Sequence, residues 1–206
     1  MAQTKTQNGA QNGAKDGAAT ATAESAAPAE TKPRRRRITR RKAVEERVRS
    51  YFDALARHDV RAMAEHWSPN VVGDLVPIGV LRGPAELESF FRETFAAVPD
   101  LDFTVTRLVA GESEAAVEWR LSGSFTGGPF QGIEPTGRPV ELRGLDFVEL
   151  EDGMIVTNTA YYDGAEFARQ VGMLPPQDSG AERAMKGAFN AATRVRRAVA
   201  GRGAGR

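Results

Sequence analysis

Residues 125–174 alternate apolar and polar side chains and are interrupted by clusters of Gly and Pro. Alternation with a period of two places every second side chain on the same face of a β-strand, so this stretch predicts strands with one buried face. The pair Asp152-Gly153 is a strong signal for a two-residue turn between antiparallel strands. After Asp163 the pattern becomes helical. The second half of the chain therefore predicts a curved antiparallel sheet that holds a pocket, and the first half must supply helices that close it.

Three helices are predicted ahead of this sheet. From residue 43 apolar residues recur at three- and four-residue spacing, Asp59 fits the N-cap of a second, short helix, and Gly83-Pro84 begins a third with Pro in its first turn. Strands are predicted at residues 70–76, 101–110, 114–125, 138–150 and 154–162, and a short helix at 165–171. This order predicts an α+β fold: a conical, strongly curved antiparallel sheet wrapped around three N-terminal helices, with a ligand pocket between them.

Charge divides the 206-residue chain into three parts. Residues 1–42 combine a low-complexity segment containing a QNGA repeat with a run of eight Lys/Arg and no acid at 31–42. Residues 43–176 carry 11 Arg against 22 Asp/Glu, and residues 177–206 carry seven Lys/Arg against two acids. The first part has too few apolar residues to offset the entropy of ordering, so we expect a disordered, Arg-rich tail. The second part is expected to be an acidic folded domain, and the third a basic amphipathic helix and tail.

The two basic arms are compatible with several partners. Cations near an anionic surface gain long-range attraction, so an acidic protein, a nucleic acid or an anionic membrane would each attract them. The alternative is that the arms are solvated and offset the charge of the acidic domain. Because the apolar stripe of the C-terminal helix is mostly alanine, a stable membrane anchor is the least favoured of these possibilities.

Several kinds of site are excluded by what the sequence lacks. It has no cysteine, which removes disulfides and thiolate metal sites, and its two histidines, His58 and His66, do not have the spacing of metal ligands. It has no phosphate-binding Gly-rich loop or dinucleotide fingerprint, so we expect neither a metal nor another cofactor. It also lacks an apolar run of about 18 residues and the apolar core of a secretory signal. We therefore expect a soluble cytoplasmic protein.

Acids within apolar strands are the candidates for chemistry. Asp74 interrupts an otherwise apolar strand, and Asp146 lies between Leu145 and Phe147 in another. If these acids face the pocket, loss of hydration and mutual repulsion raise the pKa of each and make it a proton donor or base near neutrality; otherwise they lie on the solvent face. Asp163 is either a third such acid or the N-cap of the helix that follows it.

Other side chains are expected near the pocket. Tyr51 on the first helix either donates a hydrogen bond to a substrate oxygen or packs in the core with its hydroxyl at a boundary. His66 either lines the pocket or has a structural role. The side chains expected to line the pocket are His66, Trp67, Phe91, Trp119, Asn158 and Tyr162.

Five short motifs occur in order within residues 43–175, about two thirds of the chain. They are VPDL (98–101), GIEPTG (132–137), RGLDF (143–147), EDGMI (151–155), and Asp163 followed by RQVGML (169–174). In this order they resemble the SnoaL-like polyketide cyclase (ester cyclase) group of the nuclear transport factor 2-like superfamily. The resemblance implies a conical α+β barrel of the cystatin-like kind, commonly a homodimer through the sheet, with a hydrophobic pocket.

The chemistry that this resemblance implies is cofactor-free proton transfer next to a carbonyl group. It is an aldol cyclisation in the polyketide cyclases and a double-bond migration in the related ketosteroid isomerases. Family members use an aspartate near the ends of the barrel strands, which here points to Asp163 or Asp146. The ketosteroid isomerases are similar at Tyr51, at Asp146, and at Asp74 if one residue is gapped.

One departure from the family pattern keeps two functions open. Many cyclases of this group carry a His-Trp-Asp trio midway along the last strand, and the residues at those places here are Asn158, Thr159 and Ala160. The first hypothesis is a cyclase or isomerase acting on a hydrophobic, polyketide- or steroid-like carbonyl compound. In it Asp74 or Asp163 moves the proton, while Tyr51 and a neutral Asp146 stabilise the enolate oxygen. The second is a non-catalytic ligand-binding or scaffold module tethered by its basic arms to an acidic partner, nucleic acid or anionic membrane.

Overall fold

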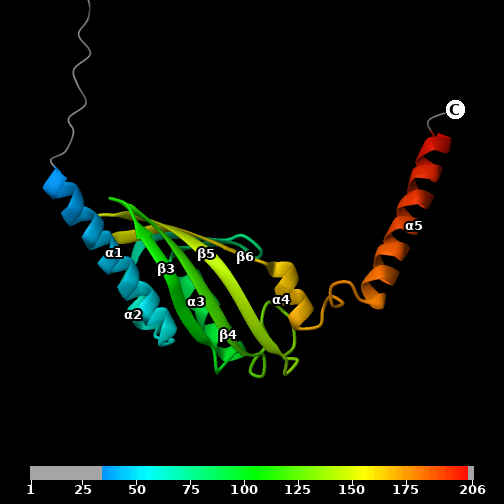
Figure 1. Ribbon diagram of the computed structural model, residues 1–206, viewed down its shortest axis with the longest axis horizontal. Helices are drawn as coiled ribbons and strands as arrows, with labels where there is room; N and C mark the ends of the chain where they lie inside the picture. Colours follow the sequence, from blue (N-terminus) through cyan, green and yellow to red (C-terminus); the bar gives the residue numbers. More distant parts are fainter. Residues whose placement is uncertain (1–33, 204–206) are drawn as a thin grey trace, which may run out of the picture. The chain divides into compact units, whose positions relative to one another are not determined.

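A six-stranded sheet forms the centre of the protein, as seen in a computed structural model that describes residues 34–203 (Figure 1). The strand order is β2-β1-β6-β5-β4-β3. The strands are β1 (Trp67–Leu75), β2 (Gly79–Arg82), β3 (Asp102–Ala110), β4 (Glu114–Ser124), β5 (Pro139–Glu151) and β6 (Met154–Tyr162). The helices are α1 (Arg34–Ala56), α2 (Val60–Ala64), α3 (Gly83–Ala97), α4 (Gly164–Gln170) and α5 (Gly180–Gly203). The predicted α+β class is confirmed, while residues 1–33 of the predicted tail lie outside the described residues.

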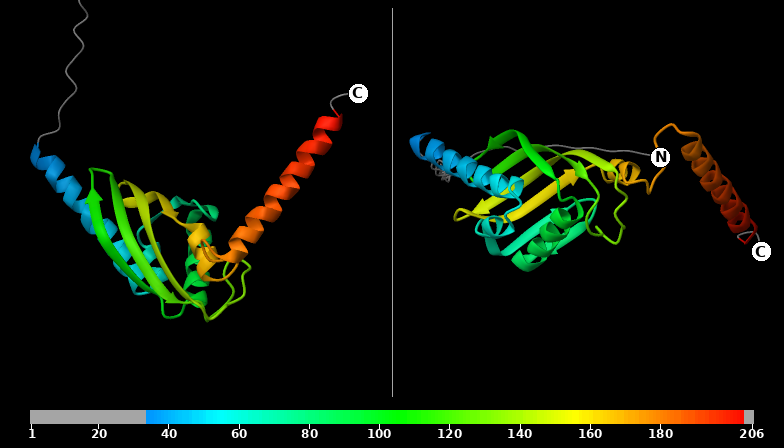
Figure 2. Two further views of the ribbon diagram at one scale, coloured as in Figure 1. Left: turned by 45° about the vertical axis from the view of Figure 1, so that its right-hand side comes forward. Right: turned by 90° about the horizontal axis from the view of Figure 1, so that it is seen from below.

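The sheet is strongly curved and mixed (Figure 2). Strands β3 to β6 form the predicted antiparallel series. Asp152 and Gly153 have φ angles of 49° and 77° in the turn between β5 and β6, as a tight hairpin turn requires. The sheet is not antiparallel throughout, because β1 runs parallel to β6 with Gly73 opposite Asn158. This pairing joins segments far apart in the chain, so the alternation within either strand could not predict it.

Helix α1 begins at Arg34 and not at residue 43, so residues 34–42 of the predicted disordered tail are helical. Arg and Lys are good helix formers, and they allow α1 to extend in this direction. Arg37 also pairs with Glu112 in the turn between β3 and β4. The predicted domain boundary therefore falls inside a helix, and one cation of the basic arm pairs with an acid of the folded domain.

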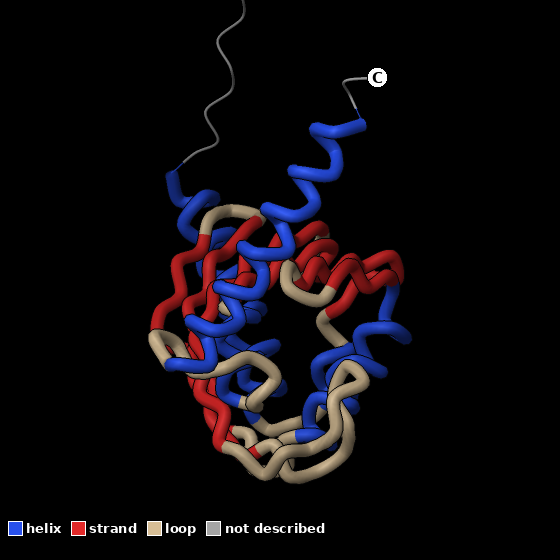
Figure 3. The backbone as a smooth tube through the Cα atoms, turned by 90° about the vertical axis from the view of Figure 1, so that its right-hand side faces the viewer, coloured by secondary structure: helices blue, strands red, loops and turns tan. Residues whose placement is uncertain are grey.

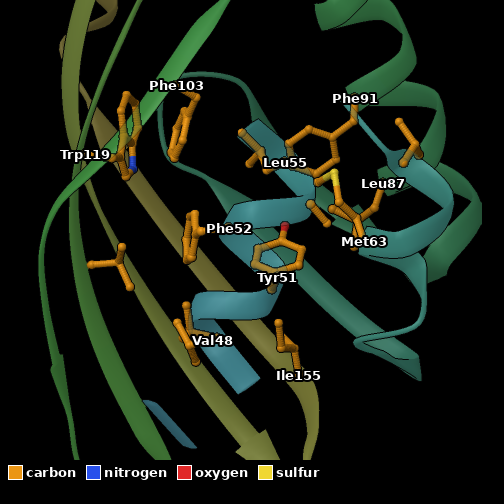
Figure 4. Packing of buried hydrophobic residues seen from close by; sticks show 14 of the residues in the cluster. Val48, Tyr51, Phe52, Leu55, Met63, Leu87, Phe91, Phe103, Trp119 and Ile155 are labelled. Atoms are coloured by element: carbon orange, nitrogen blue, oxygen red, sulfur yellow. The ribbon is translucent and has the colours of Figure 1, made fainter. Parts of the chain in front are cut away.

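The apolar face of α1 packs against the concave side of the sheet (Figure 4). Val48, Tyr51 and Phe52 on this face are each at most 1% exposed. Phe52 stacks on Phe103 of β3 with 5.8 Å between ring centroids, and Phe103 lies 5.4 Å from the ring of Trp119 on β4. Aromatic rings therefore fill the space between the helix and these strands.

The long loop between β4 and β5 belongs to the loops that gather at one end of the sheet (Figure 3). At Gly127 a Cβ atom would collide with the carbonyl oxygen of Ala96 at the end of α3, so this close approach requires glycine. Phe130 of the loop lies 6.0 Å from Phe90 of α3 and 5.8 Å from Phe167 of α4. The loop thus links α3 and α4 through aromatic contacts.

The C-terminal segment predicted to be a basic helix contains α5. Glu182 in its first turn lies 3.8 Å from Arg169 of α4 and 3.1 Å from Lys186. Across residues 34–203, none of the helices combines the length and the apolar composition needed to cross a membrane.

Candidate active site

Asp146 lies in the middle of β5 and points to the concave side of the sheet. Burial alternates along this strand, and Leu142 and Val148 on the same face are buried as well. The side chain of Asp146 is held by both neighbouring strands: Trp119 Nε1 donates to Oδ1 and Asn158 Nδ2 donates to Oδ2, each at 2.8 Å. Asp146 itself is only 6% exposed. Each carboxyl oxygen therefore has one protein donor in place of water.

Burial controls the protonation of Asp146. It raises the pKa of this carboxyl to about 6, although the hydrogen bonds from Asn158 and Trp119 act in the opposite direction. A group with this pKa is mostly ionised at neutral pH but takes up a proton readily. This is the range in which a carboxyl group can both accept and return a proton during a reaction.

A cavity of about 130 Å³ opens in front of Asp146. Helices α1, α3 and α4, the concave face of the sheet and the loop after β4 all contribute to its wall. The polar side chains in the wall are Thr94, Asp146, Asn158 and Tyr162. The apolar and aromatic side chains are Phe52, Leu55, Leu75, Phe90, Phe91, Phe95, Ala97, Val98, Leu101, Phe103, Trp119, Leu121, Phe125, Phe130, Val140, Leu142, Ala160 and Phe167. Such a wall favours an apolar ligand that is oriented by a few polar groups.

Two of the polar groups come from β6. Asn158, Ala160 and Tyr162 occupy alternate positions on this strand and all line the cavity. Burial raises the pKa of Tyr162 to about 12, so its phenol stays protonated and can donate a hydrogen bond at neutral pH. The hydroxyl of Thr94 is already used, because it donates to the carbonyl oxygen of Phe90 at 2.8 Å.

Two of the predicted acids do not line the cavity. Asp163 caps α4, where its Oδ1 accepts hydrogen bonds from the backbone of Ala165 at 2.9 Å and Glu166 at 3.0 Å. Asp74 lies between the buried residues Gly73 and Leu75 on β1 and is only partly buried itself. Because Leu75 lines the cavity, alternation places Asp74 on the opposite face of the strand.

Tyr51 is buried behind the cavity wall and is not part of it. Its ring packs 5.0 Å from Phe52 and 6.3 Å from Trp67. Burial and the negative charge of Asp146 raise the pKa of the Tyr51 phenol well above its ordinary value, so it is neutral at any physiological pH. The residue therefore acts in the core that supports the site.

His66 has a structural environment. Its Nδ1 lies 2.9 Å from the carbonyl oxygen of Ala62, and its Nε2 lies 3.0 Å from Ser50 Oγ. Burial lowers the pKa of His66, so the ring is neutral at pH 7. Neither His66 nor Trp67 contributes to the cavity wall.

The remaining residues expected to line the pocket, Phe91, Trp119, Asn158 and Tyr162, do lie in its wall. Thr94, Phe52 and the loop residue Phe130 also line it without having been expected there. The helical spacing of the aromatic residues marked a buried face, but spacing alone does not tell a core contact from a cavity wall. Within residues 34–203, no group of three His, Cys, Asp or Glu side chains is arranged to hold a metal ion.

The curved sheet and the helices packed on it are consistent with the nuclear transport factor 2-like fold. Residues 45–171 match the SnoaL-like polyketide cyclase family, and the chain belongs to this family. No curated protein matches the chain significantly.

Several solved structures share the fold of this chain. AclR from Streptomyces galilaeus, assigned as a hydroxylase, is 22% identical with a TM-score of 0.58, and the match covers 66% of this chain and 99% of AclR. A protein of Jannaschia sp. CCS1 assigned as a SnoaL-like polyketide cyclase is 20% identical with a TM-score of 0.60, and the match covers 66% of this chain and 95% of the Jannaschia protein. TsrD from Streptomyces laurentii is 25% identical with a TM-score of 0.58, and the match covers 65% of this chain and 98% of TsrD. At these identities the likeness establishes the fold and not the reaction.

Proposed function

We propose that the protein is a cofactor-free cyclase or isomerase that moves a proton next to the carbonyl group of a hydrophobic small molecule. The observation that carries this proposal is the carboxyl group of Asp146, the one acid that the described residues contribute to the wall of an otherwise largely apolar cavity. Neither Asp74 nor Asp163 reaches this cavity, so Asp146 takes the role of the base.

In the proposed reaction an oxygen of ionised Asp146 takes a proton from the carbon beside the ligand carbonyl. The electron pair of the C–H bond moves into the new C=C bond of an enolate, and the negative charge moves to the carbonyl oxygen. The neutral phenol of Tyr162 lies in the wall and can donate a hydrogen bond that stabilises this oxygen. Asp146 then returns the proton to another carbon in an isomerase. In an aldol cyclisation the enolate carbon attacks a second carbonyl carbon, the π electrons of that C=O bond move to its oxygen, and the resulting alkoxide takes the proton from Asp146.

Solvent deuterium exchange tests the proposal. The full chain is incubated in D2O with 1-tetralone, an apolar ketone, and deuterium entering the carbon beside the carbonyl is followed by mass spectrometry. Loss of a general base typically costs about a hundredfold or more in rate, so Asp146→Asn should remove most of the protein-dependent exchange. Asp163→Asn is the matched control, since asparagine also caps helices, and it should leave the rate within about twofold. Equal exchange by the wild type and D146N would show that another group moves the proton.

The second candidate, a non-catalytic ligand-binding module, uses the same cavity. It is favoured by Asn158, Thr159 and Ala160, which stand in place of the trio common in the family's cyclases. The same experiment separates the two functions. A wild-type protein that binds the ketone without accelerating exchange is a binding module.

We also propose two kinds of partner for the domain. A homodimer through the sheet is supported by apolar side chains on the outer face, where Val109, Leu145, Phe147 and Tyr161 are 41–51% exposed. An acidic partner, nucleic acid or anionic lipid is supported by the exposed cations of α1 and α5. Truncation after residue 176 should lower retention on heparin at low salt if α5 makes such a contact. A cytoplasmic location is likewise an expectation from the sequence.

A further inference from the structure

Asn158 has a buried oxygen without a hydrogen-bond partner. The residue is 7% exposed, and its Nδ2 donates to Asp146 at 2.8 Å. Its Oδ1 is fully enclosed and accepts no hydrogen bond from any group of the described chain. Buried side-chain oxygens in folded proteins are nearly always paired, so an exception at a cavity wall points to a partner that binds there.

The ionised carboxyl group of Asp146 fixes the orientation of this amide. Turning the Asn158 side chain by 180° would place its oxygen against Oδ2 of Asp146, and two acceptors would then face each other. With Nδ2 held by the carboxylate, the oxygen is the half of the amide left over. Asp146 therefore provides the base and also holds Asn158 so that the amide oxygen of Asn158 is left as an acceptor.

None of the described residues donates a hydrogen bond to this oxygen. The residues paired with Asn158 on the neighbouring strands are Gly73 and Val148, which have no polar side chains. The donor groups of Trp119 and Thr94 are both engaged elsewhere. Tyr162 lies four residues further along β6, about 13 Å away at the usual rise of a strand.

We propose that Asn158 Oδ1 accepts a hydrogen bond from a hydroxyl group on the ligand, and that the cavity selects hydroxylated cyclic compounds over unsubstituted ones. The site's identity as a ligand cavity rests on the proposed function. A ring enters the apolar part of the cavity while its hydroxyl group lies against Asn158. The selected class is therefore a phenol-like or enol-like ring, which separates hydroxyl-rich polyketides from largely hydrocarbon, steroid-like ligands.

The size of the cavity agrees with one enclosed ring. Its volume of about 130 Å³ is close to that of a dry protein cavity of about 150 Å³ that binds benzene. Further rings of a larger ligand would extend from the cavity mouth.

The test compares phenol with toluene, which replaces the hydroxyl by a methyl group of similar size. Dissociation constants are measured by NMR titration of the full chain at about pH 8, where Asp146 is ionised. The ratio of the phenol and toluene dissociation constants is compared between the wild type and each variant. The difference in hydrophobicity between the two probes cancels in this comparison. Asn158→Leu should shift this ratio by about tenfold in favour of toluene, as expected for loss of one good hydrogen bond.

Thr159→Val is the control variant, because Thr159 neighbours Asn158 on β6 but lies on the face of the strand turned away from the cavity. Its phenol-to-toluene ratio should match the wild type. A similar collapse in both variants would assign the preference to the packing of β6 and overturn the role of Asn158. An unchanged ratio in N158L would show that the ligand hydroxyl does not pair with Oδ1 and would overturn the inference.

A measurement on the wild type keeps the proposal testable if N158L does not fold. Phenol should move the ¹³Cγ resonance of Asn158, whereas toluene and anisole, which have no donor, should leave it nearly in place. Equal shifts with all three probes would overturn the inference. Binding is measured without turnover, so the two proposals can fail separately. If the protein prefers the hydroxylated probe but catalyses no deuterium exchange, the proposed function is refuted and this inference stands. If it catalyses exchange without that preference, this inference is refuted and the proposed function stands.

Discussion

Replacing Trp119 by phenylalanine should raise the pKa of Asp146. The indole Nε1 donates to Asp146 Oδ1 at 2.8 Å, and this hydrogen bond stabilises the ionised carboxyl. A hydrogen bond to a charged group contributes about 1.5–3 kcal/mol, and one pKa unit corresponds to about 1.4 kcal/mol. Losing the bond should therefore move the pKa upward by about one to two units from its starting value of about 6.

The shift can be measured by ¹³C NMR titration of aspartate carboxyl groups in the full chain. The Asp146 resonance is assigned by its absence in D146N. Phe103→Leu is the control, because Phe103 packs 5.4 Å from Trp119 and its truncation disturbs the same wall without removing a donor. The pKa in F103L should stay within about half a unit of the wild type. A pKa in W119F that falls or does not move would refute the view that this hydrogen bond holds the ionised form.

Three further predictions concern stability and assembly. Burial raises the pKa of Asp146 above its ordinary value of about 3.8, so the folded state binds the proton more tightly than the unfolded chain, and stability falls as pH rises from about 4 to about 6. Urea unfolding should show the stability of D146N relative to wild type increasing over this range by up to about 3 kcal/mol, and a constant difference would contradict the raised pKa. Asp163→Ala removes the cap of α4 and should cost about 1 kcal/mol in unfolding free energy without changing deuterium exchange; a loss of exchange would restore Asp163 as a catalytic candidate. If the outer sheet face forms a homodimer, Phe147→Glu should convert it to a monomer in analytical ultracentrifugation, and an unchanged sedimentation coefficient would exclude this interface.

Local alternation predicted the strands that bear the site. The strand predicted at residues 138–150 is β5 at Pro139–Glu151, and the one predicted at residues 154–162 is β6 at Met154–Tyr162. The N-cap of α2 was also correct, since Asp59 Oδ1 accepts a hydrogen bond from the backbone of Ala62 at 3.0 Å. These features depend on neighbours in the sequence, which is why they could be read from it.

Features that depend on distant segments could not be predicted in the same way. The parallel pairing of β1 with β6 joins strands that are separated in the chain by β2, α3 and β3 to β5. The face of Asp74 depends on the strand register, and a shift of one residue moves a side chain to the other face. From the sequence, Asp163 was equally compatible with a helix cap and with a catalytic acid. The structure shows that it caps α4. Asn158 was expected in the pocket, but its unpaired oxygen follows from its contact with Asp146 on another strand.

The central claim, that Asp146 moves a proton in an apolar cavity, is tested most directly by the pH dependence of deuterium exchange into bound 1-tetralone. The base must be ionised to act, so the protein-dependent rate of the wild type should rise with pH and level off above an apparent pKa of about 6. The D146N protein should show no such rise. Wild-type exchange without a titration near pH 6, or the same titration in D146N, would contradict the claim.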